Sequence, residues 1–286
     1  MIVVADSGST KTSWAVLTNA EEPQQFSTEG YNPYYVDAEY IQNSFLASFS
    51  HQLAREEVKQ VYFYCAGCAG GKDEIVKNAL TAVFPNAGIV IQSDLLAAAK
   101  SLLGDSNGFI SILGTGTNTG IYSDGKIIAQ VNSLGFLLGD EGSGAYLGKK
   151  LLSLFARKAM PIELMEAFES DYALTPATVV PTFYDVELQN RYSAKFTIFL
   201  SKHIDHPYIK KLVKMAFIDF FENIVSLYPD YKSYSINSIG SIGFTFTDQL
   251  KEVANNYGMN IGKINKSPME GLIAYHQLIR PFPTFL

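Results

Sequence analysis

The sequence predicts an α/β protein of two lobes, each a mixed sheet flanked by helices. Its 286 residues suffice for about two domains of roughly 150 residues each. Hydrophobic residues make up 47% of the chain and charged residues 17%, so most of its length can bury a core and disorder is excluded. The order of strands and helices in the first third begins again near Gly108, which indicates a repeat.

The first lobe is predicted from short apolar runs and one clear helical period. Tyr40, Ile41 and Phe45 recur at spacings near 3.6 residues and predict a helix. Runs of β-branched and aromatic residues predict strands, and Asp94 begins a helix rich in Ala and Leu. The expected strands are 2–6, 12–18, 24–29, 60–64 and 89–91, and the expected helices are 38–53, 73–84 and 94–103.

The second lobe repeats this order and adds a helical insertion. A strand over 108–113 ends in a Gly/Thr turn, and a hairpin at 123–125 separates two further strands, 119–122 and 126–131. After a largely helical section, strands 235–239 and 259–264 alternate with helices 246–257 and 269–279. We therefore expect a first lobe over 1–107, joined by the C-terminal helix at about 268–286, and a second lobe over 108–267 with its helical insertion at about 143–227.

Charge and composition argue against several classes of function. The net charge of −6 argues against nucleic acid as a partner, because phosphate backbones are bound by excess Lys and Arg. No run of about 18 apolar residues predicts a membrane span, and the start MIVVADSG lacks the basic region of a signal peptide. Two Cys residues cannot build a disulfide framework. We expect a cytoplasmic protein with no membrane partner.

Two turns of small residues are candidates for phosphate binding. The segments 7–12 and 114–118 each follow a buried strand and turn back as a hairpin. Such turns expose successive backbone N–H groups to an anion, and their hydroxyls add donors. Neither segment fits a dinucleotide fingerprint or a P-loop, because a hairpin follows instead of a helix. Two such turns in one chain could bind the phosphates of a nucleotide from both sides.

Two carboxylates lie at strand ends in the first lobe. Asp6 precedes the first turn and is interpreted either as the start of that turn or as a group that holds Mg²⁺ beside a phosphate. Asp94 is interpreted either as a helix N-cap or as a general base that accepts a proton from an attacking hydroxyl. The nearby phosphate turns favour the general base.

Three further segments are rich in glycine or cysteine. The run 139–144 places two acids among three glycines, which favours ligand contact over a role of the acids as helix-dipole partners. The glycines in 238–243 either let a flat ring lie against the backbone or form a simple strand-to-helix loop. Cys65-Ala66-Gly67-Cys68 could bind metal, perform redox chemistry or share an iron–sulfur cluster with a second subunit. Its small neighbours favour a tight turn with two buried thiols.

These motifs, in this order, resemble a known family. Segments 6–12, 114–118, 139–143, 240–241 and 268–271 are similar to the actin/hexokinase/Hsp70 ATPase superfamily, and within it to the BadF/BadG/BcrA-type ATPases and N-acetylglucosamine kinases. The resemblance covers essentially the whole chain. It implies two RNase H-like lobes that close on ATP and Mg²⁺.

The resemblance also assigns roles to single residues. Asp94 takes the place of the catalytic aspartate, and Asp6 would hold Mg²⁺ through water. The implied ATP contacts are Ser9, Thr10, Lys11, Thr115, Gly240, Ser241 and Thr245, and the implied sugar contacts are Asn32, Thr117, Asn118, Gly135 and Asp140. The chain departs from the family at Leu134-Gly135, where the kinases often carry Trp-Gly, and at Ser7 and Ser9, where glycines are usual.

The leading hypothesis is an ATP-dependent kinase that phosphorylates N-acetylglucosamine or a related amino sugar at its 6-hydroxyl. One alternative is an ATPase that activates a 2-hydroxyacyl-CoA dehydratase or benzoyl-CoA reductase and carries an iron–sulfur cluster between two subunits. Another is a nucleotide-binding sensor without turnover. The expected partner is a small sugar, and the resemblance is also compatible with a homodimer.

Overall fold

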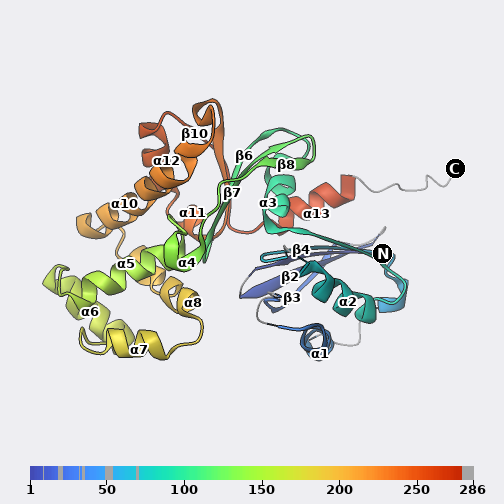
Figure 1. The fold of residues 1–286 in the computed structure, drawn as a ribbon, viewed down its shortest axis with the longest axis horizontal. Helices are drawn as coiled ribbons and strands as arrows, with labels where there is room; N and C mark the ends of the chain where they lie inside the picture. Colours follow the sequence, from blue (N-terminus) through green and yellow to red (C-terminus); the bar gives the residue numbers. More distant parts are fainter. Residues whose placement is uncertain are drawn as a thin grey trace. The chain divides into compact units, whose positions relative to one another are not determined.

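The computed structural model describes residues 1–8, 10–18, 22–31, 33, 36–48, 54–68 and 71–278 (Figure 1). It confirms the α/β prediction, because the described residues form two five-stranded sheets flanked by helices. The first sheet has the order β3-β2-β1-β4-β5 and the second has the order β10-β9-β6-β7-β8. The two orders are the same when each set of five strands is numbered along the chain, so the predicted repeat is present.

The first sheet combines an antiparallel meander with two parallel strands. β1 pairs antiparallel with β2 and parallel with β4, and β4 pairs parallel with β5. The elements are β1 (Ile2–Ser7), β2 (Lys11–Leu17), β3 (Gln24–Glu29), α1 (Ala38–Ser48), η1 (Arg55–Glu57), β4 (Gln60–Cys65), α2 (Asp73–Val83), β5 (Gly88–Ser93), α3 (Asp94–Leu103) and, from the end of the chain, α13 (Met269–Leu278).

Alternation along β1 explains why helices cover both faces of this sheet. Val3 and Ala5 belong to a buried cluster with residues of α1 and α2, whereas Val4 belongs to a second cluster with residues of α3 and α13. Successive side chains of a strand point to opposite faces, so one apolar strand can contribute to two cores. Trp14 lies in the first cluster, stacks on Phe26, and donates its indole N–H to Thr28 Oγ1 at 3.1 Å.

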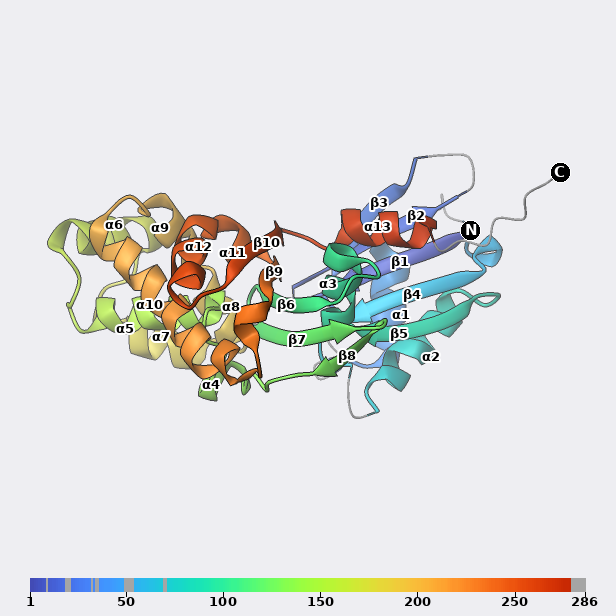
Figure 2. The same cartoon turned by 90° about the horizontal axis from the view of Figure 1, so that it is seen from above.

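The second sheet has the same plan and receives the helical insertion. Figure 2 shows β7 between β6 and β8, and β9 runs parallel to β6. Its elements are β6 (Gly108–Leu113), β7 (Thr117–Ser123), β8 (Lys126–Ala129), α4 (Gly135–Leu138), α5 (Gly144–Ala156), α6 (Ile162–Tyr172), α7 (Val179–Asp185), α8 (Gln189–Ala194), α9 (Thr197–Lys202), α10 (Pro207–Asn223), η2 (Val225–Leu227), η3 (Tyr231–Ser233), β9 (Ser235–Ile239), α11 (Ser241–Thr245), α12 (Thr247–Asn256) and β10 (Asn260–Asn265).

One large apolar cluster holds the second sheet and the insertion together. Phe109 and Leu113 of β6 are fully buried in it with residues of α5, α6, α10 and α12. Phe168 of α6 contributes an aromatic centre, with ring contacts to Phe155, Phe196 and Phe199 at centroid distances of 4.5, 5.4 and 5.1 Å. The insertion is therefore part of the core of this half of the chain.

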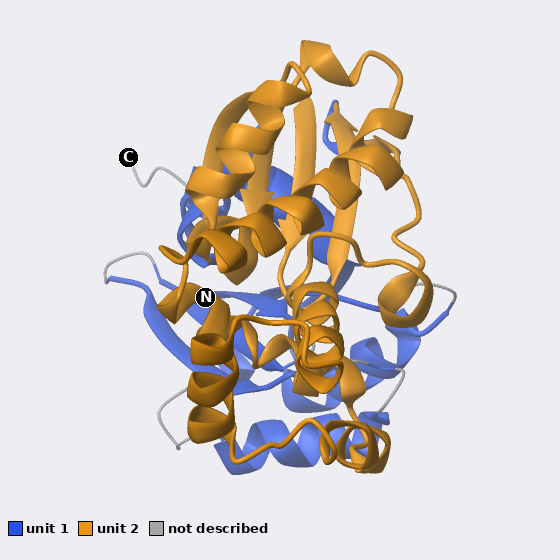
Figure 3. Ribbon diagram, turned by 90° about the vertical axis from the view of Figure 1, so that its left-hand side faces the viewer, with its two compact units in different colours: residues 1–106, 124–126, 267–286 blue, residues 107–123, 127–266 orange. Residues whose placement is uncertain are grey.

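The chain forms two compact units, shown in blue and orange in Figure 3. Unit 1 comprises Met1–Ser106, Asp124–Lys126 and Ser267–Leu286, and unit 2 comprises Asn107–Ser123 and Ile127–Lys266. Among the described residues, no helix has both the length and the apolar character needed to cross a bilayer.

α1 covers 38–48 of the expected helix 38–53, and 49–53 lie outside the described residues. The structure corrects the predicted secondary structure in two places. β7 already begins at Thr117, so the turn after β6 is limited to Gly114–Gly116. α4 and α11 were not expected, and both are single short turns next to glycines that read as loops.

Candidate active site

In unit 1, the carboxyl ends of three strands bring the predicted carboxylates to one edge of the sheet. Ser7 of β1 pairs in register with Cys65 of β4, which pairs with Ser93 of β5. Asp6 and Asp94 lie directly beside this row, before Ser7 and after Ser93. Ligands of open α/β sheets bind outside such carboxyl ends, so this edge is a candidate site.

Asp94 does not cap its helix. Ser93 is the N-cap of α3, and its Oγ accepts the backbone N–H of Leu96 at 3.2 Å. Asp94 is the first helical residue, with Oδ1 accepting the N–H of Leu95 at 2.7 Å. The N-cap interpretation of Asp94 is therefore wrong. The carboxylate lies half-buried at the positive end of the helix dipole, which favours its ionised form.

Asp6 lies close enough to Asp94 for the two carboxylates to interact. Burial raises the pKa of Asp6 to about 7, and the charge of Asp94 acts in the same direction. Mg²⁺ is usually held by one or two carboxylates together with water and phosphate oxygens. A cation here would offset the repulsion between the two acids, so these residues fit the Mg²⁺ site that the family implies.

The first turn uses its hydroxyls differently from the prediction. Ser7 is buried, its Oγ lies 2.7 Å from Thr12 Oγ1, and the same Oγ accepts the backbone N–H of Tyr31 at 3.1 Å. Ser7 and Thr12 thus brace the hairpin from inside. Thr10 and Lys11 are exposed at the turn, where the N–H of Gly8 donates to the carbonyl of Lys11 at 3.0 Å. The predicted contacts Ser9 and Asn32 lie outside the described residues.

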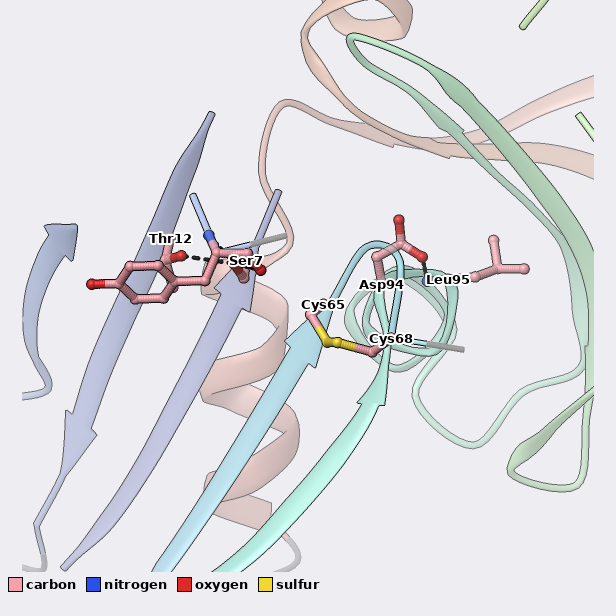
Figure 4. Close-up of a disulfide and its surroundings, with 7 residues drawn as sticks. Ser7, Thr12, Cys65, Cys68, Asp94 and Leu95 are labelled. Carbon is pink, nitrogen blue, oxygen red and sulfur yellow. Dashed lines mark hydrogen bonds between the residues drawn. A yellow bond between two sulfur atoms is a disulfide. The ribbon is translucent and has the colours of Figure 1, made fainter. Parts of the chain in front are cut away.

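Cys65 and Cys68 are joined by a disulfide, which corrects the expectation of two buried thiols. Figure 4 shows this disulfide between Ser7 on β1 and Asp94 at the start of α3. Cys65 is 1% exposed and Cys68 is half-buried. An iron–sulfur cluster requires thiolate ligands. Because the two sulfurs are bonded to each other and Cys65 is enclosed, the pair in this form does not fit a cluster shared between subunits.

In unit 2, the carboxyl ends of β6 and β9 are packed backbone against backbone. Gly240 follows β9 with a φ of +126°, and a Cβ on it would lie 2.3 Å from the carbonyl oxygen of Leu113. The start of α5 closes the same edge, since the N–H groups of Gly144 and Ala145 donate to the carbonyls of Gly114 and Thr115 at 2.8 and 3.0 Å. Thr115 and Gly240 therefore share one edge.

Asp140 is fastened to the turn after β6. Its Oδ1 accepts the backbone N–H of Thr117 at 3.2 Å, while Thr117 Oγ1 donates to the carbonyl of Glu141 at 2.7 Å. Burial raises the pKa of Asp140, and the Thr117 N–H, the Ser133 hydroxyl and the charge of Lys149 act in the opposite direction. The Asp140 carboxylate is thus held in place by the backbone of Thr117, which is itself a predicted sugar contact.

The other predicted residues of unit 2 lie on surrounding segments. Ser241 and Thr245 are exposed on α11, directly after Gly240. Asn118 is half-buried on β7 and accepts a hydrogen bond from Gln130 Nε2 at 2.7 Å. Gly135 begins α4, five residues before Asp140. Unit 2 therefore brings Thr115, Thr117, Asp140 and Gly240 to one edge, while Gly135 belongs to the loop that leads to it.

Lys149, which contacts that loop, was not predicted from the sequence. Its Nζ donates to the carbonyl of Phe136 at 2.7 Å. Lys149 stands five residues after Gly144 on α5, in a Lys-Lys pair that resembles an ordinary solvated helix face. Nothing in the local sequence distinguishes Lys149 from Lys150. The partner of Lys149 is a backbone carbonyl, which every residue carries.

Two surface cavities lie elsewhere in the insertion. One of about 500 Å³ lies between α5 and α10, and another of about 420 Å³ lies between α5 and α7. Neither is lined by a predicted site residue. Within the described residues, no three His, Cys, Asp or Glu side chains gather as a metal cage.

Comparison with known proteins identifies structural relatives. No protein-family model and no curated protein matches the sequence. A Porphyromonas gingivalis structure named as a candidate N-acetylglucosamine kinase matches with 36% identity and a TM-score of 0.92 over 98% of this chain and 99% of that one. A similarly named protein from Chromobacterium violaceum has 15% identity and a TM-score of 0.73 over 96% and 98% of the chains. A ROK family glucokinase from Streptomyces griseus, solved with glucose and AMPPNP, has 12% identity and a TM-score of 0.59 over 97% and 98%.

The repeated sheet and these matches define a protein with the actin-like ATPase fold. The chain belongs to the BadF/BadG-type, N-acetylglucosamine kinase-like family of that superfamily. The two more distant matches share the fold alone.

Proposed function

We propose that this protein is an ATP-dependent sugar kinase that phosphorylates N-acetylglucosamine or a related amino sugar at its 6-hydroxyl. The observation that carries the proposal is the position of Asp94 beside Asp6 at the carboxyl edge of unit 1, with Ser93 capping the helix in its place. The similarity at 36% identity to a candidate N-acetylglucosamine kinase supports the choice of substrate.

Asp94 would act as the general base. Its position at the first turn of α3 places the carboxylate at the positive end of the helix dipole, where it would accept the proton of the sugar 6-hydroxyl as that oxygen attacks the γ-phosphorus of ATP. The bond from the γ-phosphorus to the bridging oxygen of ADP breaks as the new bond forms. A positioned base of this kind contributes about 10²–10⁴ in rate.

The phosphates would be held by the turns that follow β1 and β6. Thr10 and Lys11 are exposed at the β1–β2 turn, and Thr115 lies at the turn whose carbonyls are tied to α5. Asp6 would hold Mg²⁺ through water, and that ion would supply charge neutralisation for the phosphoryl group. Gly240, Ser241 and Thr245 would contact the nucleoside, since Ser241 and Thr245 are exposed on α11 directly after Gly240.

The sugar would be recognised by Asp140 and its neighbours, with Asn32, Thr117, Asn118 and Gly135 as further contacts. Leu134 is 57% exposed with a φ of +60°, so its side chain is available to a ligand. It stands where related kinases often carry Trp, and we propose that it contacts the acyl group with a smaller apolar surface.

The proposal is tested by a screen of ADP release with hexoses and N-acylhexosamines. We expect N-acetylglucosamine or a close relative to stimulate ADP release, and Asp94→Asn to lower kcat by about 10²–10⁴ while ATP still binds. Asp73→Asn is the matched control, because Asp73 is the first residue of α2 and also lies in a helix N-terminal turn. It should keep near wild-type turnover.

The same screen separates the alternatives. If no sugar raises ADP release above background, the kinase proposal is wrong. ATP binding without turnover would then favour the sensor, and visible absorbance after anaerobic purification would favour the activator.

A further inference from the structure

The loop Ser133–Asp140 carries two of the proposed sugar contacts in a backbone conformation that is costly by itself. Leu134 and Asp140 both have a positive φ, at 60° and 57°. An L-residue in this region pays a penalty that surrounding contacts must offset. The loop therefore depends on anchors outside its own backbone.

Few of the loop's own side chains can serve as anchors. Leu134, Leu137 and Leu138 are 57%, 78% and 79% exposed. Only Phe136 among the apolar residues turns inward, with its ring 6.3 Å from that of Phe183. Apart from Asp140, which is fastened to Thr117 at the end of the loop, the attachment of this segment is concentrated at Phe136.

Lys149 of α5 contacts Phe136 in two ways. Its Nζ donates to the Phe136 carbonyl at 2.7 Å and lies 4.9 Å from the centroid of the Phe136 ring. A charged donor makes a stronger hydrogen bond than a neutral one, and an ammonium is also attracted to an aromatic face. One half-buried side chain thus holds both the backbone and the ring of the only large apolar residue of the loop that turns inward.

The charge of Lys149 also acts on the acids that follow the loop. Burial lowers the pKa of Lys149, whereas the carboxylates of Asp140 and Glu141 act in the opposite direction and Lys150 adds to the lowering. The ammonium therefore faces Asp140 and Glu141 electrostatically while it holds Phe136. Phe136 in the first half of the loop and Asp140 at its end therefore both interact with the ammonium of Lys149.

We propose that Lys149 is a positioning residue for sugar recognition, which fixes the Ser133–Asp140 loop through Phe136 and so sets the placement of Gly135 and Asp140. This inference rests on the proposed kinase function for its kinetic consequence. Its structural consequence is independent of any substrate.

The neighbouring Lys150 provides a matched control. It is also half-buried and lies 4.9 Å from the Tyr146 ring, but its Nζ pairs with Asp219 at 2.7 Å, away from the loop. Lys149→Met and Lys150→Met each remove one ammonium from adjacent positions of α5 and keep an unbranched apolar stem. Only Lys149→Met removes the bond to Phe136.

The kinetic test compares both variants for N-acetylglucosamine and for ATP. We expect Lys149→Met to raise KM for the sugar about tenfold, the effect of losing one charge-assisted hydrogen bond, with KM for ATP within twofold and kcat within threefold. Lys150→Met should leave all three within twofold. Equal changes for both substrates, or an equal effect of Lys150→Met, would show a general structural role and overturn the proposal.

Hydrogen exchange tests the same inference without substrate. The N–H of Gly139 donates to the Gly135 carbonyl and the N–H of Asp140 to the Ser133 carbonyl, both at 2.8 Å. Lys149→Met should accelerate exchange of these two amides about tenfold or more, and Lys150→Met should not. Unchanged exchange of these amides in Lys149→Met would overturn the proposal for Lys149 even if the protein is a kinase. If the protein has no kinase activity, hydrogen exchange still tests whether Lys149 anchors the loop.

If Lys149→Met fails to fold, Phe136→Leu provides a second route. It removes the ring beneath Lys149 but leaves the carbonyl, so it should raise KM for the sugar in the same direction by a smaller factor of about threefold. An unchanged KM in Phe136→Leu, combined with unchanged exchange, would count against the loop anchor.

Discussion

The two units share one sheet topology and use the carboxyl edge of that sheet in different ways. In unit 1 the edge carries ionisable groups, with Asp6 and Asp94 close enough to influence each other. In unit 2 the equivalent strands β6, β9 and β10 end in Leu113, Ile239 and Asn265, and the edge between β6 and β9 is built from glycine backbone in close contact. The topology fixes where a ligand can bind, and the residues at the strand ends decide what chemistry each edge can perform.

The largest effect is expected where backbone contact is tightest, at Gly240. Gly240→Ala would place a Cβ 2.3 Å from the Leu113 carbonyl oxygen at a φ of +126°, so either the strand ends separate or the backbone is strained. We expect a loss of about 4 kcal/mol or more in the free energy of unfolding. Urea denaturation, followed by a signal that reports on unit 2, measures this loss in the free energy of unfolding.

Gly114→Ala is the control, because a Cβ there meets nothing within 4 Å. It should cost less than about 1 kcal/mol. Equal losses for both variants would mean that the packing at the edge of unit 2 does not depend on Gly240.

The next effect concerns charge in unit 1 and its dependence on pH. The pKa of Asp6 is raised from 3.8 to about 7, so the folded state favours the protonated acid. The stability from this preference is fully present below about pH 4 and is lost as pH rises through about 7. In metal-free buffer with EDTA, Asp6→Asn should therefore exceed the wild type in stability by about 4 kcal/mol at pH 8, with the difference vanishing towards pH 4.

Thermal unfolding of the wild type and of Asp6→Asn between pH 4 and pH 8 tests the sign of this difference in stability. A constant difference at every pH would mean that Asp6 titrates normally. The buried pair of acids would then not be the distinguishing feature of unit 1.

A smaller effect is expected for the disulfide. Closing the four-residue loop Cys65–Cys68 removes little chain entropy, so reduction should cost about 2 kcal/mol of stability. The melting temperature should fall on addition of a phosphine reductant in the wild type and stay constant in a Cys65→Ala/Cys68→Ala double variant. Alkylation of two thiols in the native wild-type protein without reductant would contradict the bond.

Most of the fold could be predicted because its signals are local and repeated. Apolar runs identified all ten strands of the described residues, and the second occurrence of the same order identified the repeat. The short helices α4 and α11 escaped prediction because Gly135, Gly240 and Gly243 read as loop residues. Their conformation is set by contacts with α5 and β6 that are distant in the sequence.

The candidate site was harder to predict at the level of single atoms. Ser93 and Asp94 are equally suitable N-caps by residue type, and only the register of β5 decides that Ser93 takes that role. Ser7 reads as a phosphate donor but bonds Thr12 and Tyr31, because hairpin geometry turns its hydroxyl inward. Lys149 donates to a backbone carbonyl, and such a partner cannot be recognised from the residue types in the sequence.

The proposed role of the Asp94 carboxylate is to make a sugar hydroxyl nucleophilic towards ATP. The most direct measurement follows radiolabel from the γ-position of ATP into N-acetylglucosamine under single-turnover conditions. We expect labelled sugar 6-phosphate with wild-type protein and, for Asp94→Asn at saturating ATP, formation slower by two orders of magnitude or more. Label transfer at an unchanged rate in Asp94→Asn would contradict it.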